Sequence, residues 1–258
     1  MHKTLAPLAL LLLTACGTPH GELRVLSYNI RHGADINWEM RLKEQVEFIA
    51  SRNADLIALQ EVDNKCQRSG NIDEAQLFAD SMSMQSVFQK FIDLQGGTYG
   101  IAALSKLAIS KVEPKFYTPG GEPRNFPLLH IKLAETEVLF VPLHFDWLSD
   151  NTVRKKQAQE LIADLDKSGM AVILAGDFNA LPNSATMQLF SAAGFSFKTG
   201  KRHTFHGSKG DDTSIEIDFI AVRSNNELQL ELLHTETLEQ RELSDHAAVE
   251  AQIRWQQL

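Results

Sequence analysis

Short apolar runs alternate with amphipathic segments from Leu23 to the end of the chain. Most of the runs are bounded by Gly, Pro, Asn or Asp, and several are rich in Val, Ile and Phe, which is typical of half-buried or fully buried strands. The pattern predicts strands at Leu23–Ile30, Asp55–Gln60, Gln85–Ile92, Gly100–Ser105, Phe126–Ala134, Glu137–Phe145, Ala171–Ala175, Glu216–Val222, Leu228–Leu233 and Ala247–Ile253.

Other segments have the spacing of helices. One set of apolar residues recurs at intervals of 4, 4 and 3, which places its members on one helix face: Trp38, Leu42, Val46 and Ile49. A second amphipathic segment runs from Val153 to Leu165, and Ser149 or Asp150 is its expected N-cap. Shorter helices are predicted at Glu74–Met82 and near Ser184–Ala193.

Helices separate some of the predicted strands, while other strands follow one another directly. This mixture predicts an α/β (α+β) fold of layered sheets flanked by helices, rather than a purely parallel βαβ arrangement. Beyond residue 22 no Pro-, Gly- or Ser-rich linker interrupts the chain, so residues 23–258 are expected to form one domain. A content of 43% hydrophobic and 22% charged residues is ordinary for a globular domain.

The first residues have the pattern of a secretory signal. Lys3 precedes an apolar run, Leu5–Leu13, that has signal-peptide rather than membrane-span length. Small residues then precede Cys16, which resembles a bacterial lipoprotein cleavage site; an ordinary secretory signal with a chance cysteine is the alternative. We therefore expect a signal peptide at 1–15 and a lipidated Cys16 with a tether through residue 22. Gly17 after the cysteine favours, by resemblance to enterobacterial lipoproteins, the outer membrane of the cell envelope.

Charge and cysteine content narrow the functional classes. The formal net charge of −8 leaves no basic field to hold a polyanion, which argues against a DNA-coating role. An enzyme that acts on phosphates remains compatible with it, because a bound metal ion supplies local positive charge. With Cys16 used as an anchor, Cys66 has no partner for a disulfide. Cys66 is expected to be a packing or loop residue rather than a nucleophile, because no nearby His offers a base.

Polar residues recur where the apolar runs stop or begin. One acid or amide at a strand end is an ordinary turn residue. Several strand ends that all supply oxygen or imidazole groups are harder to explain in that way, since layered α/β folds place their sites at the carboxyl ends of strands. These residues are Asn29, Glu61, His144, Asp177, Asn179, Asp218, Asp245 and His246.

The segment Gly176-Asp177-Phe178-Asn179 follows a strongly apolar strand and is the most specific of these. We expect Gly176 to allow a sharp turn, and Asp177 and Asn179, two residues apart, to share one side of an extended segment. A carboxylate beside an amide can hold a water molecule, because one accepts its proton and the other orients it. Glu61 offers a hard oxygen ligand of the type that Mg²⁺ takes.

These residues resemble the motifs of the endonuclease/exonuclease/phosphatase superfamily, which includes DNase I-like nucleases, inositol-polyphosphate 5-phosphatases and bacterial sphingomyelinases. The resemblance extends from about residue 23 to 255, and its motifs occur in the order of the family. They are Ser27-Tyr28-Asn29-Ile30, Gln60-Glu61-Val62-Asp63, Tyr99-Gly100 with Leu104-Ser105-Lys106, Leu143-His144-Phe145-Asp146, Gly176-Asp177-Phe178-Asn179, Ile217-Asp218-Phe219-Ile220 and Ser244-Asp245-His246.

The resemblance implies a four-layer α/β/β/α sandwich. One Mg²⁺ is enough for the expected chemistry, and whether the site takes one or two ions stays open. It implies Glu61 as the main metal ligand, with Asn29 beside it and Asp245 completing the network. It implies that Asp177 and Asn179 position and activate the attacking water, and that His144 contacts the phosphate. His246, paired with Asp218, would bind a phosphate oxygen or act as the general base, and the choice between Asp177 and His246 as base stays open.

Some positions depart from the family pattern. Ile101 after Tyr99-Gly100 indicates a packed strand. Arg31 stands where abasic-site endonucleases usually have an Asp, which puts a second metal ligand in doubt; it could meet a phosphate or lie on the surface. We expect Arg124 to be a solvated charge, with a phosphate contact as the alternative. Trp147 could line a substrate cleft, pack in the core or lie on the rim.

The sequence therefore predicts a divalent-metal-dependent hydrolase of phosphodiester or phosphomonoester bonds. Mg²⁺ is the expected ion, with Mn²⁺ as an alternative. The expected substrate is a nucleic acid, a lipid head group or a small organic phosphate, and the protein is expected to be a monomer, anchored to a membrane through its lipid. A non-catalytic binding or scaffold protein on the same fold is the competing hypothesis.

Overall fold

The computed structural model describes residues 18–200, 203–207 and 214–258. The expected signal peptide, Cys16 and the start of the tether lie outside these residues. Within them, no helix is both long enough and apolar enough to cross a membrane.

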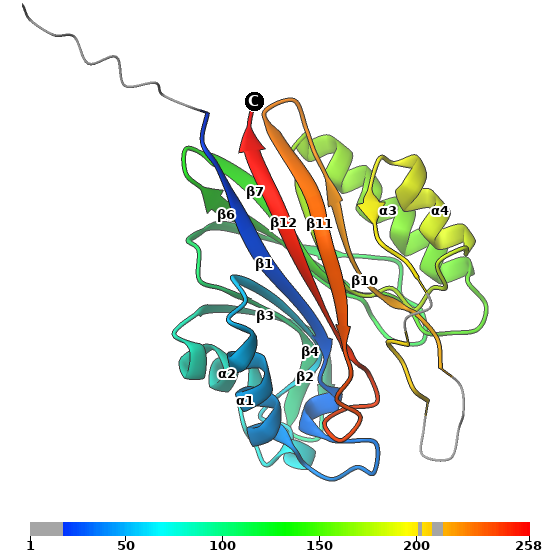
Figure 1. The fold of residues 1–258 in the computed structure, drawn as a ribbon. Helices are drawn as coiled ribbons and strands as arrows, with labels where there is room; N and C mark the ends of the chain where they lie inside the picture. Colours follow the sequence, from blue (N-terminus) through cyan, green and yellow to red (C-terminus); the bar gives the residue numbers. More distant parts are fainter. Residues whose placement is uncertain (1–17, 201–202, 208–213) are drawn as a thin grey trace, which may run out of the picture.

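Two six-stranded sheets pack against each other, with helices on their outer faces (Figure 1). The first sheet has the order β11 (Leu228–Leu238), β12 (Ala248–Gln257), β1 (His20–Asn29), β2 (Leu56–Asn64), β4 (Gly97–Ser105) and β3 (Gln85–Leu94). The second has the order β5 (Ile109–Phe116), β6 (Asn125–Leu133), β7 (Thr136–His144), β8 (Val172–Asp177), β10 (Asp218–Arg223) and β9 (Ser196–Phe197).

Four α-helices in the described part of the chain form the outer layers. Helices α1 (Leu42–Arg52) and α2 (Glu74–Met82) cover the first sheet, and α3 (Thr152–Ser168) and α4 (Ala185–Ala192) cover the second. Short 3-10 turns lie at Arg31–Gly33 and Gln67–Ser69. The arrangement confirms the predicted four-layer α/β/β/α sandwich.

Strand periodicity explains why the layers stack. In β8, Ile173 faces the apolar cluster between the sheets, while its neighbours Val172 and Leu174 face the cluster under α3 and α4. Successive side chains of a strand point to opposite faces, so a strand with a cluster on each side must be apolar throughout. That is the pattern of the run Ala171–Ala175.

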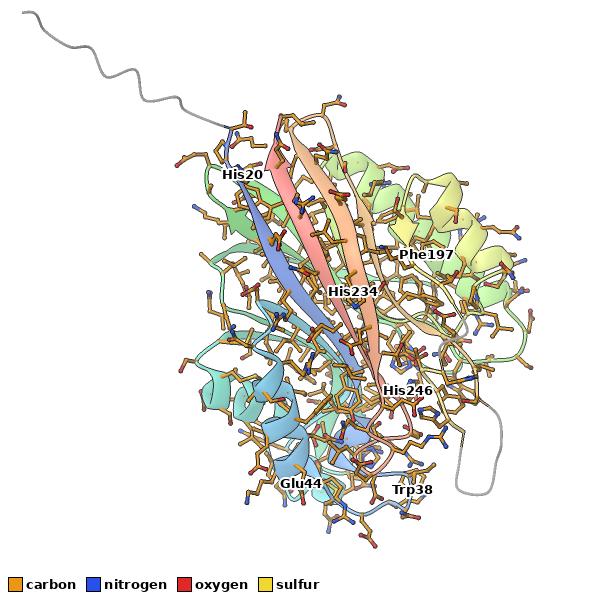
Figure 2. The ribbon with its side chains drawn as sticks, viewed as in Figure 1. His20, Trp38, Glu44, Phe197, His234 and His246 are labelled. Carbon is orange, nitrogen blue, oxygen red and sulfur yellow. The ribbon has the colours of Figure 1, made fainter. Side chains whose placement is uncertain are left out.

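The topology brings the functional strand ends to one edge of the sandwich. Strands β1 and β2 run parallel, as do β7 and β8, while β12 and β10 run antiparallel to β1 and β8. The starts of β12 and β10 therefore lie beside the ends of the parallel strands. Figure 2 shows His246 and Trp38 at this end of the molecule and His20 at the opposite end.

Several predicted elements are confirmed and some are wrong. Helix α2 has the predicted bounds. Trp38 was expected on the first helix face but lies before α1, with a φ of 66° and 67% exposure. Asp150 does not cap α3 directly; Asn151 is the N-cap residue, and Asp150 accepts bonds from Thr152. Strand β1 begins at His20, inside the predicted tether, and strands β5 and β9 were not predicted.

Candidate active site

A pocket of about 700 Å³ opens at the edge where the strand ends converge. Its lining includes Glu61, His144, Asp177 and His246, which come from both sheets. Asn29, at the end of β1, contacts three of these four side chains. The structure thus brings the predicted core of the site together.

Glu61 reaches the pocket through an irregularity in β2. The ladder between β2 and β4 shifts register between Leu59 and Val62, and Glu61 has a φ of 59°, an unusual value for a non-glycine residue. Asn29 Nδ2 lies 3.1 Å from Glu61 Oε1, while Asn29 Oδ1 accepts the Arg31 backbone N–H at 3.1 Å. Asn29 therefore acts here as a donor to the carboxylate, and its role as a metal ligand stays a prediction.

Asp177 and Asn179 lie in a tight turn, and the expected extended geometry is wrong. Asn179 has a φ of 46°, and its backbone N–H donates to Asp177 Oδ1 at 2.8 Å. The Asn179 side-chain Nδ2 donates to the Phe145 carbonyl at 3.0 Å. Asn and Asp side chains bond their own backbone in this way and tolerate positive φ. Hydrogen bonds within the turn therefore hold both residues at the pocket, and not the alternation of side chains along a strand.

Gly176 is needed for packing and not for the sharp turn that we expected. It lies inside β8, and a Cβ atom placed on it would meet the Leu143 carbonyl oxygen at 2.0 Å. Strands β7 and β8 could not approach as they do with any larger residue here. Their pairing places His144 opposite Asp177.

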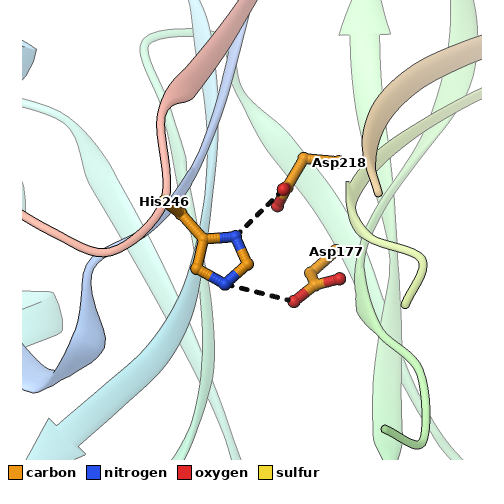
Figure 3. A group of neighbouring side chains, drawn as sticks. All are labelled: Asp177, Asp218 and His246. Carbon is orange, nitrogen blue, oxygen red and sulfur yellow. Dashed lines mark hydrogen bonds and ion pairs between the residues drawn. The ribbon is translucent and has the colours of Figure 1, made fainter. Parts of the chain in front are cut away.

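His246 lies between two carboxylates of the second sheet (Figure 3). Its Nδ1 is 3.0 Å from Asp218 Oδ2, and its Nε2 is 3.8 Å from Asp177 Oδ2. The ring of Phe205 packs on the imidazole, with ring centroids 4.9 Å apart. The predicted pairing of His246 with Asp218 is present, and His246 links the start of β12 to the second sheet.

Burial and neighbouring charges shift the pKa values of these groups. Burial alone would lower the pKa of His246, but Asp218, together with Asp177, raises it to about 10. Burial raises the pKa of Asp177, and the nearby Asp218 charge adds to this. Burial also raises the pKa of Glu61, with Asp245 as the second cause. The neighbouring carboxylates thus favour the protonated form of the His246 imidazole, and they repel one another.

His144 faces Asp177 from the neighbouring strand. Its Nε2 is 3.4 Å from Asp177 Oδ2, and its buried Nδ1 has no hydrogen-bond partner among the described residues. Burial lowers the pKa of His144 well below its usual value, and the charge of Arg124 lowers it further. A neutral imidazole at this position can donate a hydrogen bond.

Asp245 and Arg31 form an ion pair at the pocket wall. Arg31 Nε is 3.2 Å from Asp245 Oδ2, and Arg31 Nη1 donates to the Asp35 carbonyl at 2.8 Å. The guanidinium lies 3.9 Å from the centroid of the Trp38 ring. Arg31 is buried, so the surface alternative for it is wrong.

Other predictions have mixed outcomes. Arg124 is 1% exposed, so its interpretation as a solvated charge is wrong. Trp147 lies on the pocket rim with 57% exposure. Ile101 is fully buried in β4, as expected for a packed strand. Cys66 is buried, and its Sγ lies 3.3 Å from the Thr98 carbonyl, which agrees with a packing role.

Some pocket residues were not predicted. His32 lines the pocket, although nothing in the sequence supported a role for it, and so does Phe205. Phe205 lies between two histidines in the sequence and pairs with His246 through an isolated β-bridge. No local signal identifies such a residue, because its partner is distant in the chain.

Three of the buried side chains could hold a metal ion. Asp177, Asp218 and His246 each offer a ligand atom, and these atoms lie within 4.8 Å of one another. A carboxylate-rich group with one histidine is a suitable donor set for a divalent cation.

Two paired sheets with a buried Asp/His centre at one edge define the class of this fold. The chain belongs to the endonuclease/exonuclease/phosphatase family, whose model matches residues 26–246. No curated protein sequence matches it significantly.

Solved structures share the fold. An endonuclease/exonuclease/phosphatase from Beutenbergia cavernae has a TM-score of 0.75 at 14% identity, covering 90% of this chain and 71% of that one. A conserved protein of unknown function from Enterococcus faecalis has a TM-score of 0.74 at 20% identity, covering 90% and 99%. ANGEL2, a 2′,3′-cyclic phosphatase, has a TM-score of 0.74 at 14% identity, covering 91% and 95%. At these identities the likeness concerns the fold.

Proposed function

We propose that the chain is a divalent-metal-dependent hydrolase of phosphoester bonds. The observation that carries the proposal is the convergence of Glu61, Asp177, His144 and His246 on one pocket. Hydrolysis of a phosphoester needs a cation near the developing charge, an oriented water molecule and donors to the phosphate oxygens. A structural neighbour of the same fold, ANGEL2, is itself a phosphatase.

The donor set fits a hard divalent ion such as Mg²⁺. Glu61 and Asp245 repel each other across the pocket, and the charge of Asp245 contributes to the raised pKa of Glu61. A cation between them would relieve this repulsion, and carboxylate oxygens are its preferred ligands. We assign the ion to this pair because His246 and Asp218 in the neighbouring group already bond each other at 3.0 Å. When bound, the ion would supply positive charge to the phosphate.

The protein groups divide the remaining work. Asp177 accepts the proton of the attacking water at its carboxylate, because the bond to Asp218 favours the protonated form of His246, which has no free base to offer. Asn179 and the turn around it hold the Asp177 carboxylate in place. His246 and the neutral His144 donate hydrogen bonds to phosphate oxygens as charge develops on them.

The test is hydrolysis by the purified chain with and without Mg²⁺. The panel contains bis-p-nitrophenyl phosphate, plasmid DNA, sphingomyelin and inositol phosphates. We expect Mg²⁺-dependent turnover of at least one of these, and its loss in Asp177→Ala. Equal inactivity of both proteins on every substrate would contradict the proposal.

We also propose that the protein acts in the cell envelope, anchored through a lipid on Cys16. The apolar run before Cys16 supports this proposal. Cys16→Ser should stop the protein from partitioning with membranes in fractionated cells, and continued membrane association would exclude the anchor.

A further inference from the structure

Arg124 has an unusual environment for a charged side chain. It is 1% exposed, and its Nε and Nη1 atoms have no hydrogen-bond partner among the described residues. Its counter-ion is Glu122, whose Oε2 lies 3.3 Å from Nη1 without forming a hydrogen bond. A buried guanidinium normally satisfies its donors, because leaving them unpaired is costly. The free donors of Arg124 therefore call for an acceptor.

The position of Arg124 shows where that acceptor would lie. Arg124 lines the same pocket as Glu61 and His144, and its charge contributes to the pKa shifts of both. The ring of Phe91 lies 5.2 Å from its guanidinium and limits its movement. The free donors thus belong to a fixed cation beside the reactive centre.

A second arginine of the pocket is held in a similar way. Arg154, also buried, donates from Nη1 to the Asp146 carbonyl at 2.8 Å, while its Nε has no partner in the described part of the chain. The Asp146 carboxylate accepts the backbone N–H groups of Gly121 at 2.7 Å and Leu148 at 3.0 Å. Asp146 therefore joins the loop that precedes Arg124 to the helix that carries Arg154.

The other two arginines of the pocket differ. Arg31 pairs with Asp245, and Arg68 binds Asp63 through two bonds of 2.8 Å. Both have a carboxylate partner, as Arg124 has in Glu122, but the Nε atoms of Arg124 and Arg154 have no hydrogen-bond partner among the described residues. His144 and His246 already provide donors for the phosphate that reacts. The arginine donors at the pocket come in addition to those of the two histidines.

We propose that Arg124, supported by Arg154, forms a second anion subsite that selects substrates with a second phosphate group near the phosphoester that is cleaved. The inference rests on the proposed function and specifies its substrate class. Arginine suits this task because its planar donors match the oxygens of a phosphate.

Two chromogenic substrates that differ by one phosphate group test the subsite. They are thymidine 5′-(p-nitrophenyl phosphate) and the same compound with a 3′-phosphate, assayed with Mg²⁺. We expect the wild type to show a kcat/KM about tenfold higher or more for the bisphosphorylated compound, mainly through KM. Arg124→Gln should bring the ratio close to one, and Arg124→Lys should restore part of it. Arg254→Gln, on the exposed part of β12, is the matched control and should keep the wild-type ratio.

If the wild type has a kcat/KM ratio of one or less for the bisphosphorylated over the other compound, the proposed subsite is wrong while the proposed function stands. This comparison uses the wild type alone and does not depend on the folding of a variant. If Arg254→Gln changes the ratio as much as Arg124→Gln does, the subsite is also wrong, because the loss of any positive charge would then explain the effect. If neither compound is hydrolysed, the substrate panel still decides the proposed function, and anion binding decides the subsite. In EDTA, inorganic pyrophosphate should raise the Tm of the wild type and of Arg254→Gln but not of Arg124→Gln; equal shifts in all three would overturn it.

Discussion

The two sheets contribute to the pocket through the same topology but with different chemistry. Each has a parallel strand pair, β1·β2 or β7·β8, and an antiparallel strand that starts at the same edge, β12 or β10. The first sheet supplies Glu61, with Asp245 shortly before β12, and the second supplies Asp177, with Asp218 bonded to His246. Equivalent positions in the topology therefore carry acids in both halves.

The acids differ in what accompanies them. Glu61 reaches the pocket through a bulge and meets an amide, whereas Asp177 ends a regular strand and faces two imidazoles. A carboxylate beside histidines is suited to proton transfer, while two carboxylates that repel each other are suited to hold a cation. The comparison supports the proposed assignment, in which the first half would hold the metal ion and the second would transfer the proton.

The largest expected effect comes from the second half. Asp177→Asn removes the proton acceptor and should lower kcat by about 10²–10⁴-fold with the fold retained, measured on whichever substrate the panel identifies. Asp166→Asn, at an exposed ion pair with Arg223, is the matched control and should keep full activity. Full activity in Asp177→Asn would exclude Asp177 as the proton acceptor and leave His246 as the candidate base.

Asp218→Asn should reduce the free energy of unfolding by up to about 3–5 kcal/mol near pH 6.5, because it breaks a buried pair. In the wild type the pKa of His246 is raised to about 10, so protonated His246 stabilises the fold fully below pH 6.5, and this contribution is lost as the pH rises toward 10. The variant should show a flatter dependence over that range. Urea unfolding in EDTA at several pH values measures this pH dependence of the free energy of unfolding. The same dependence in the variant as in the wild type would contradict the pairing of His246 with Asp218.

Glu61→Gln tests the first half. At Mg²⁺ concentrations about 100 times its dissociation constant, the ion should stabilise the wild type by about 2.7 kcal/mol, and the variant should lose most of this gain. Asp218→Asn should keep it, because Asp218 belongs to the half without the proposed metal. Thermal unfolding with and without Mg²⁺ decides between the halves: loss of the gain in Asp218→Asn alone would place the ion at Asp177, Asp218 and His246.

Gly176→Ala has the smallest expected effect and concerns how the second half is assembled. The added methyl group would meet the Leu143 carbonyl oxygen, so β7 and β8 must separate. We expect a loss of about 1–3 kcal/mol of stability, as for overpacked cores, and a lower kcat because His144 and Asp177 shift apart. Unfolding and activity measured on the same preparation check this, and wild-type values for both would show that the strands tolerate the methyl group.

Much of the architecture could be predicted because strand and helix periodicity is local. The apolar run of β8 and the bounds of α2 follow from their own residues. Trp38 was misplaced because its spacing fits a helix, while the turn before α1 and the contact with Arg31 hold it outside. A contact with a distant partner overrode the local pattern.

The chain by itself determined which polar residues stand at strand ends, because strand order and apolar spacing are properties of neighbouring residues. Tertiary structure decided how those residues pair and how deeply they are buried. His246 faces Asp218 and Asp177 because the two sheets pack together, and Arg124 is buried because Phe91 and the pocket walls enclose it. Burial and charge pairing are sums over segments far apart in sequence, so the chemistry of the site emerges only when the sheets meet.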